Sequence, residues 1–164
     1  MNELFMKAAL KEAKKAFLED EVPVGAVVVR GDKIIAKAHN QRERKNVATH
    51  HAELLAVEKA CKKLNSWRLD DCEVYVTLEP CIMCAGAIIN ARIKKVYYGA
   101  KEPKGGACES RFSLLSSGVL NWQTDYEGGV MEKECSSLIT DFFKAKREKA
   151  KLPQEKSSDS LENI

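Results

Sequence analysis

The sequence predicts an α/β fold in which one mixed β-sheet carries helices on both faces. Two β-branched runs on either side of Gly31-Asp32 predict a β-hairpin, and the later segments alternate between helical and extended patterns. The chain has 164 residues, of which 45% are hydrophobic and 31% charged, so it can bury a core without disulfides. We therefore expect a single domain over residues 1–151, followed by a polar, disordered tail over residues 152–164.

The individual elements follow from the spacing of apolar residues in each segment. Apolar residues that recur every three or four positions indicate amphipathic helices, and short β-branched or aromatic runs indicate strands. The predicted helices cover residues 3–18, 50–64, 81–91, 112–116 and 131–149. The predicted strands cover residues 22–29, 33–39, 72–78, 94–100 and 122–128. Residues 41–49 predict a polar loop that ends at Thr49, the predicted N-cap of the second helix.

The N-terminal segment and the cysteine content bear on the cellular compartment. Charged residues interrupt residues 1–15 every few positions, so this segment lacks the apolar centre of a secretory signal. No apolar run in the sequence reaches the length that spans a membrane. We therefore expect a cytoplasmic protein whose six cysteines stay reduced, so that metal binding or catalysis is a better explanation of the cysteine content than disulfides.

Cys81 and Cys84 form a Cys-x-x-Cys pair at a predicted junction between a strand and a helix. At such a position both sulfurs can face one ion, and the positive end of the helix stabilises thiolates. His51 stands at the start of the preceding helix, and Glu53 follows two residues later. A His-x-Glu motif followed by Pro-Cys-x-x-Cys is the signature of zinc-dependent deaminases. The predicted ligand is His51 rather than His50, because only His51 has a carboxylate two positions further on.

This combination predicts a catalytic zinc site with His51, Cys81 and Cys84 as ligands, because three protein ligands leave the fourth position for water. A zinc-bound hydroxide would attack the carbon that carries an exocyclic amine, and Glu53 would shuttle the proton and help ammonia leave. Two other interpretations use the same cysteines. A structural zinc ribbon needs a fourth ligand, and the other cysteines form no second close pair. A thioredoxin-like dithiol leaves His51 and Glu53 unexplained.

Beyond the zinc motifs, the chain resembles the bacterial tRNA-specific adenosine deaminases, which convert the wobble adenosine of an arginine tRNA to inosine. The resemblance covers nearly the whole chain except the tail and lies in EVPVGAVVV, AHNQ, HAE, YVTLEPCIMCAGAIINARI, YYGAKEPKGGA and DFFKAKR. It implies a cytidine deaminase-like fold, which is a three-layer α/β/α sandwich with a central mixed five-stranded sheet. It also implies a homodimer with one Zn²⁺ per subunit and a hydroxide that attacks adenine C6.

The resemblance further implies residues that bind the substrate. Asn40 matches an asparagine that hydrogen-bonds the flipped nucleotide, the backbone of Ala52 matches a base contact, and Pro80 belongs to the cysteine motif. Glu102 lies in the loop that faces the nucleotide, at a position where aspartate is frequent in the family. Lys104 adds positive charge in the same loop, which suits a phosphate contact.

The C-terminal helix carries further predicted contacts to an anticodon stem-loop. Residues 144–151 contain five basic residues against one glutamate and directly follow an aromatic pair. We expect Phe143, Lys146 and Arg147 to contact RNA, although a lone charge run is more often a solvated helix face. The alternatives are a deaminase of free guanine or cytosine and, from another class, a non-catalytic zinc module that binds RNA. Glu53 argues against the latter, because a binding module has no use for a proton shuttle.

Overall fold

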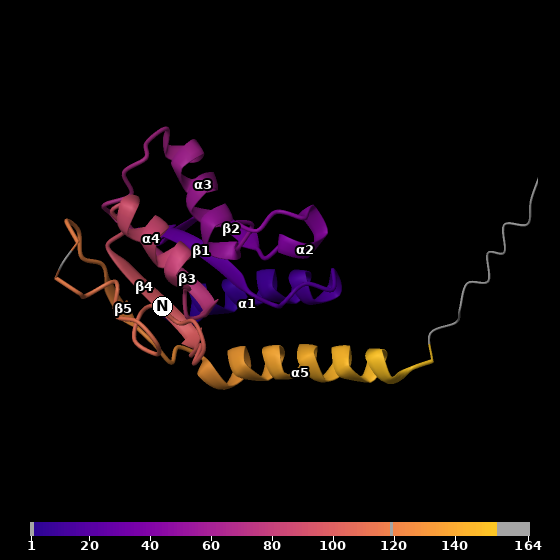
Figure 1. The fold of residues 1–164 in the computed structure, drawn as a ribbon. Coiled ribbons are helices and arrows are strands. Elements are labelled where there is room, and N and C mark those ends of the chain that lie inside the picture. Colours follow the sequence, from indigo (N-terminus) through magenta and orange to yellow (C-terminus); the bar gives the residue numbers. More distant parts are fainter. Residues whose placement is uncertain (1, 119, 154–164) are drawn as a thin grey trace, which may run out of the picture.

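The computed structural model describes residues 2–118 and 120–153, which form a three-layer α/β/α sandwich around a five-stranded sheet (Figure 1). The strands are β1 Gly25–Arg30, β2 Lys33–His39, β3 Cys72–Leu78, β4 Lys95–Ala100 and β5 Asp125–Glu127. The helices are α1 Asn2–Leu18, α2 Arg42–Lys45, α3 Ala52–Leu64, α4 Ile82–Asn90 and α5 Glu132–Lys151. None of these helices is both long and apolar enough to cross a membrane. Most of the predicted tail, from residue 154 onward, lies outside the described residues.

The sheet is mixed, as the sequence predicts. Its strand order is β2-β1-β3-β4-β5, and β1 pairs antiparallel with both β2 and β3. β3, β4 and β5 run parallel, so α4 makes the crossover between β3 and β4. Gly31 closes the predicted hairpin with a positive φ of 63°, a conformation that glycine adopts without steric cost.

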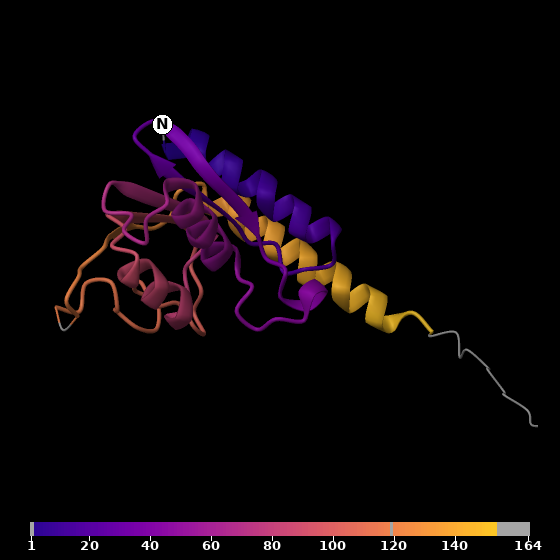
Figure 2. The same cartoon turned by 90° about the horizontal axis from the view of Figure 1, so that it is seen from above.

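Side chains alternate between the two faces of the sheet, and each face has its own apolar core. Figure 1 and Figure 2 show α1 and α5 on one face and α3 and α4 on the other. Tyr75 stacks on Tyr97 with ring centroids 4.4 Å apart, and both lie in the core with Phe5 of α1. Val74 and Val76, the neighbours of Tyr75, lie in the core beneath α3 and α4. The prediction that helices cover both faces of the sheet is therefore confirmed.

β1 begins at Gly25, three residues later than the β-branched run that starts at Val22 predicts. Pro23 has no N–H group to donate to a ladder, so the segment before Gly25 leaves the sheet. A Cβ on Gly25 would collide with the backbone of α1 at Ala9, which shows how closely α1 packs on β1. Val22 and Val24, outside the strand, line a cavity beside the sheet.

Residues 112–116 form a loop, so the helix predicted for this segment is wrong. The backbone N–H groups of Phe112 and Leu114 donate to the carbonyl oxygens of Gly106 and Ala107, each at 3.0 Å. Leu115 is fully buried. The apolar pattern therefore reflects a buried loop that bonds to a preceding segment, and not the apolar face of a helix.

Two further predictions about residues 41–51 are also wrong. Residues 42–45 form the short helix α2 where the sequence predicts a loop, and a carboxylate oxygen of Glu21 accepts a hydrogen bond from the backbone N–H of Arg44. The N-cap of α3 is His51 instead of Thr49, because the backbone N–H of His51 donates to the Thr49 carbonyl within a turn. His51 consequently lies at the N-terminus of α3, before its first turn.

Candidate active site

The predicted metal ligands lie at the N-termini of two helices on the same face of the sheet. His51 is the N-cap of α3 and Cys81 is the N-cap of α4, and both residues have extended backbone angles. Neither side chain caps its own helix, so both can face the space between the helices. Cys84 lies in the first turn of α4 and is fully buried. Local chain geometry therefore presents all three side chains to one point.

The distances among the three donor atoms fit a zinc ion. His51 Nδ1 lies 3.7 Å from Cys81 Sγ and 3.5 Å from Cys84 Sγ, and all three atoms lie within 4.8 Å of one another. Tetrahedral zinc with ordinary bond lengths places its nitrogen and sulfur ligands about 3.6 Å apart. None of the other four cysteines, all of them within the described residues, joins this group. A structural zinc ribbon would therefore lack its fourth protein ligand. A catalytic zinc site needs only three protein ligands, because water takes the fourth position.

In the metal-free protein the titratable groups of the site shift one another's pKa values. The hydrogen bond from Cys84, together with His51, lowers the pKa of Cys81 to about 4, and the same contact with Cys81 raises the pKa of Cys84. The hydrogen bond with Cys81 and the charge of Glu53 raise the pKa of His51. Burial raises the pKa of Glu53 to about 7. One sulfur is thus already a thiolate at neutral pH, and Glu53 titrates where a general acid-base group works best.

A cavity of about 170 Å³ opens beside the ligand cluster. The predicted site residues that line it are Asn40, His51, Ala52, Glu53, Cys81 and Glu102. Pro80 is buried outside the lining, and its carbonyl oxygen accepts a hydrogen bond from the backbone N–H of Ala107 at 2.8 Å. Lys104 is exposed, does not line the cavity, and donates its backbone N–H to the Glu102 carboxylate at 3.0 Å. The cavity thus gathers residues from several separate segments around the three ligands.

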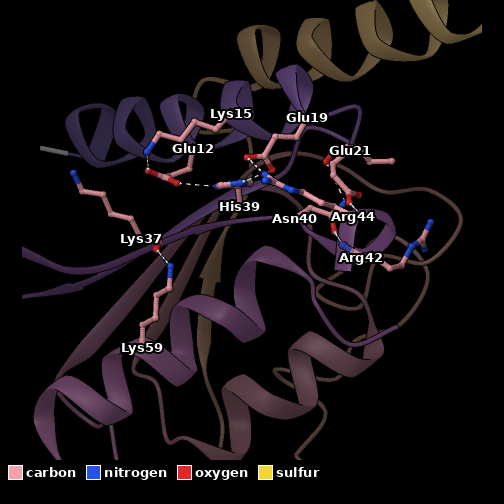
Figure 3. A network of polar contacts seen from close by, with 11 residues as sticks. Glu12, Lys15, Glu19, Glu21, Lys37, His39, Asn40, Arg42, Arg44 and Lys59 are labelled. Atoms are coloured by element: carbon pink, nitrogen blue, oxygen red, sulfur yellow. Dashed lines mark hydrogen bonds and ion pairs between the residues drawn. The ribbon is translucent and has the colours of Figure 1, made fainter. Parts of the chain in front are cut away.

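Asn40 follows β2, and backbone groups fix its side chain (Figure 3). Its Nδ2 donates to the carbonyl oxygen of Val22 at 3.2 Å, and its Oδ1 accepts from the backbone N–H of Arg42 at 3.1 Å. The residue is only 7% exposed, and it lines the cavity. One amide proton and one lone pair of the side chain remain for a ligand, and their directions are set before any ligand binds.

A network of charged side chains ties the segment next to Asn40 to α1 (Figure 3). The two ring nitrogens of His39 lie 3.2 Å from a carboxylate oxygen of Glu12 and 3.0 Å from one of Glu19. Glu19 also forms an ion pair with Arg44 of α2 at 2.7 Å. Burial disfavours the charged form of both carboxylates, but hydrogen bonds from Lys15 and His39 to Glu12, and from His39 and Arg44 to Glu19, outweigh it and lower the pKa of each. β2, α1 and α2 are therefore held together at this point.

The RNA contacts predicted on α5 lie apart from the cavity. Phe142 is 3% exposed and packs edge-on against Phe17 of α1, whereas Phe143 is 41% exposed. Lys146 Nζ lies 5.6 Å from the ring centroid of Phe142, and Arg147 is exposed. The C-terminal half of α5 extends beyond the sheet (Figure 1). An RNA that contacts both the cavity and these side chains must therefore span the distance between them.

Five residues that line the cavity were missed by the sequence-based analysis. They are Val22, Val24, Arg42, Leu78 and Glu79. Two sequence signals could have indicated three of these residues. Pro23 separates Val22 from Val24, and Glu79 directly precedes the Pro-Cys-x-x-Cys motif. Nothing in the sequence separates the arginine of this group from its neighbours in a charged segment, or the leucine from the other apolar residues of its strand.

The chain is similar to known deaminases over most of its length. A family model described as MafB19-like deaminase matches residues 1–147. A tRNA-specific adenosine deaminase of Bacillus subtilis (strain 168) is 46% identical over 158 residues, which cover 96% of this chain and 98% of that protein. The structure of a tRNA:A34 deaminase, studied for A-to-I editing at the wobble position of transfer RNA, has a TM-score of 0.80 and 44% identity and covers 82% of this chain and 98% of that one. A guanine deaminase from Nitrosomonas europaea, with a TM-score of 0.75 and 22% identity over 85% of this chain and 83% of that one, shares the fold alone.

The fold and the clustered imidazole and thiol groups define a base deaminase with a cytidine deaminase-like architecture. The chain belongs to the MafB19-like deaminase family and to the tRNA-specific adenosine deaminases. The family resemblance drawn from the sequence is therefore confirmed. The guanine deaminase shows that one fold serves different bases, so the fold does not by itself select the substrate.

Proposed function

We propose that this protein catalyses the hydrolytic deamination of adenosine to inosine at the wobble position of a tRNA, with an arginine tRNA as the expected substrate. The observation that carries the proposal is the convergence of His51, Cys81 and Cys84 beside the buried Glu53 at one cavity. One imidazole, two sulfurs and an adjacent carboxylate are the parts of a zinc deaminase site. The choice of adenosine and of tRNA rests on the relatives at 44% and 46% identity.

In this proposal His51, Cys81 and Cys84 hold one Zn²⁺ per subunit. When bound, zinc supplies a Lewis acid that makes water a nucleophile near neutral pH. Glu53 would accept a proton from the attacking water and pass it to N1 of adenine; it would then take the proton of the hydroxyl group newly formed on C6 and deliver it to the departing amino group. Water adds at C6 and ammonia leaves, so a carbonyl replaces the exocyclic amine. Burial raises the pKa of the Glu53 carboxyl group, which makes it easier to protonate during the reaction than an exposed glutamate.

The base would be held by residues that already line the cavity. Asn40 offers one free donor and one free acceptor, the backbone of Ala52 lies beside His51, and Glu102 forms part of the opposite loop. The base must leave its stack to enter, and extrusion costs less from a single-stranded anticodon loop than from a duplex. Pro80 acts indirectly in this scheme, because it is buried and places Cys81.

The stem-loop backbone would contact basic side chains outside the cavity. Lys104 is exposed in the 101–111 loop, and Phe143, Lys146 and Arg147 are exposed on α5. Lysine and arginine there would neutralise phosphates, and the exposed phenylalanine offers a surface on which a base can stack. These contacts determine affinity and its dependence on salt, whereas the cavity determines which base reacts.

Binding of a synthetic anticodon stem-loop at several salt concentrations tests the α5 contacts. The double variant Lys146→Gln/Arg147→Gln should bind more weakly, and its slope of log affinity against log salt should fall by about one per lost phosphate contact. Lys62→Gln/Lys63→Gln, at the end of α3, removes the same charge from exposed positions and serves as the control. An equal slope in the wild type and the α5 variant would remove α5 from the RNA interface.

Conversion of adenosine to inosine in the same stem-loop tests the reaction itself. Glu53→Ala should keep about one zinc per chain and lose on the order of a thousandfold in rate, because it lacks the proton shuttle. Glu58→Ala, an exposed position on the same helix, should retain activity. Turnover of free guanine or cytidine but not of the stem-loop would overturn the proposed substrate. Binding of the stem-loop without turnover would indicate a non-catalytic RNA-binding module.

Metal analysis and light scattering test the remaining parts of the proposal. We expect one zinc per chain and the mass of a homodimer in solution. A monomer with full activity would show that the dimer is not needed for the reaction.

A further inference from the structure

Glu79 is a buried carboxylate that no step of the proposed reaction uses. It directly precedes Pro80 and Cys81 and is only 2% exposed. A buried carboxylate destabilises a fold strongly unless cations or hydrogen-bond donors surround it. The donors that satisfy Glu79 therefore indicate what the residue does.

Five donors come from one loop, residues 101–111. One carboxylate oxygen accepts from the backbone N–H groups of Cys108, Glu109 and Ser110 at 3.2, 2.8 and 2.9 Å. The other oxygen accepts from the backbone N–H of Glu102 at 3.0 Å and from the Ser110 hydroxyl. A single side chain thus binds both ends of a loop that contains no helix or named strand. Hydrogen bonds to a charged acceptor are stronger than those between neutral groups.

The same loop also bonds to the segment that carries Cys81. The backbone N–H of Ala107 donates to the Pro80 carbonyl at 2.8 Å, and Gly106 forms an isolated β-bridge with Cys81. A Cβ on Gly106 would collide with the Glu79 carboxyl group, so the loop backbone passes directly against that carboxyl. The loop is therefore fixed relative to the ligand cluster at several points, and Glu79 supplies the largest number of them.

We propose that Glu79 is a positioning residue that holds the 101–111 loop as a wall of the cavity, at a fixed place beside Cys81. Glu102 lines the cavity, and its backbone N–H is one of the five donors. The position of this wall relative to His51 then depends on the Glu79 carboxylate. The kinetic consequence of this inference rests on the proposed function, whereas its structural consequence does not.

Hydrogen–deuterium exchange in the zinc-loaded protein tests the structural consequence. In Glu79→Gln an NH₂ group replaces one of the two accepting oxygens, so two or three of the five donors lose their acceptor, and the remaining oxygen is no longer charged. We expect the amides of residues 102–110 to exchange on the order of tenfold to a hundredfold faster, because each hydrogen bond to a charged group contributes strongly to protection. Glu73→Gln, on the same strand, is the matched control and should leave the loop unchanged. Unchanged exchange in a folded Glu79→Gln protein would overturn the proposal.

Ser110→Ala keeps the test decisive if Glu79→Gln does not fold. It removes one donor of the five and leaves the buried carboxylate in place. We expect faster exchange of the same loop, by a smaller factor than for Glu79→Gln, with native stability elsewhere. No change in loop exchange in this variant would also count against the proposal.

Stem-loop kinetics test the functional consequence. For Glu79→Gln we expect KM to rise on the order of tenfold with a smaller change in kcat, because the wall that holds the nucleotide is loosened while Glu53 stays in place. Zinc content should remain at one per chain. Loss of zinc without faster loop exchange would assign Glu79 to support of the metal site and overturn the loop assignment. If the wild type does not deaminate the stem-loop, the proposed function fails, and the exchange measurement still decides the role of Glu79.

Discussion

Glu53→Gln is expected to stabilise the metal-free protein, by an amount that depends on pH. Glu53 is 4% exposed, and burial raises its pKa from 4.5 to about 7. An ionised carboxylate at this position costs folding free energy, whereas glutamine stays neutral. The residue that the proposed reaction needs therefore weakens the fold that carries it, as is common for catalytic groups.

The two pKa values give the size and the sign of the effect. Above pH 7 the carboxylate is ionised in both the folded and the unfolded protein, and the gap between 4.5 and about 7 corresponds to about 3 kcal/mol of lost stability. As the pH falls below 7, the folded protein binds a proton that the unfolded chain does not, so the wild type gains stability until both forms are protonated below 4.5. The advantage of Glu53→Gln over the wild type should shrink by about 2 to 3 kcal/mol between about pH 8 and about pH 5.

Urea unfolding in the presence of a chelator, followed by circular dichroism, measures this difference. Glu58→Gln removes a charge from an exposed position on the same helix and should differ from the wild type by less than about 0.5 kcal/mol throughout. In the zinc-loaded protein the nearby cation favours the ionised carboxylate, so the advantage of Glu53→Gln at high pH should fall. A difference between Glu53→Gln and the wild type that does not change with pH would refute the reasoning.

Metal removal and two sets of substitutions test other parts of the molecule. Chelation should abolish deamination and lower the Tm, and added zinc should restore both; chelator-resistant turnover would contradict the proposed site. His39→Leu leaves the carboxylates of Glu12 and Glu19 without their shared imidazole and should cost about 1 to 2 kcal/mol in urea unfolding, so an unchanged midpoint would show that the network adds no stability. Phe142→Ala, at a position 3% exposed, should cost about 3 kcal/mol, whereas Phe143→Ala, at a position 41% exposed, should cost less than about 1 kcal/mol; equal losses would contradict the packing of α5.

The ligand cluster could be predicted from the sequence because it depends on local geometry. Two short motifs place His51 and Cys81 each at the start of a helix, and the structure has both as N-caps. The alternation of helical and extended patterns predicts a mixed sheet, since each long element has a clear apolar period. Packing of α3 and α4 on the same face of that sheet then brings the two N-caps together.

Parts of the cavity wall and of the loops behind it could not be predicted, because they depend on contacts between distant segments. α2 has no apolar period, and the carboxylate of Glu21 from another segment bonds to its backbone, so its sequence resembles a loop. Residues 112–116 have apolar residues at helical spacing, but their backbone N–H groups bond to residues 106–107. The sequence distinguishes Glu79 only by its position before the cysteine motif, and its contacts become evident only when the fold brings five donors from one loop to its carboxylate.

Buried carboxylates also change how the net charge bears on RNA binding. The chain has 27 basic and 24 acidic residues, which gives a formal charge of +3 and no nucleic-acid signature by itself. Within the described residues Glu12, Glu21, Glu53 and Glu79 are buried, so a phosphate at the surface cannot contact them. The long-range electrostatic field still reflects the net charge of the whole chain. The charged groups that a phosphate can contact at the surface, however, include a larger share of basic residues than the net charge of +3 indicates. Three of these glutamates bind segments that adjoin the cavity: Glu12 contacts His39, which precedes Asn40, Glu21 contacts the backbone of α2, and Glu79 contacts the 101–111 loop. These buried glutamates thus organise the fold next to the site from within, while the exposed lysines and arginines stay available to the phosphates of an anticodon arm.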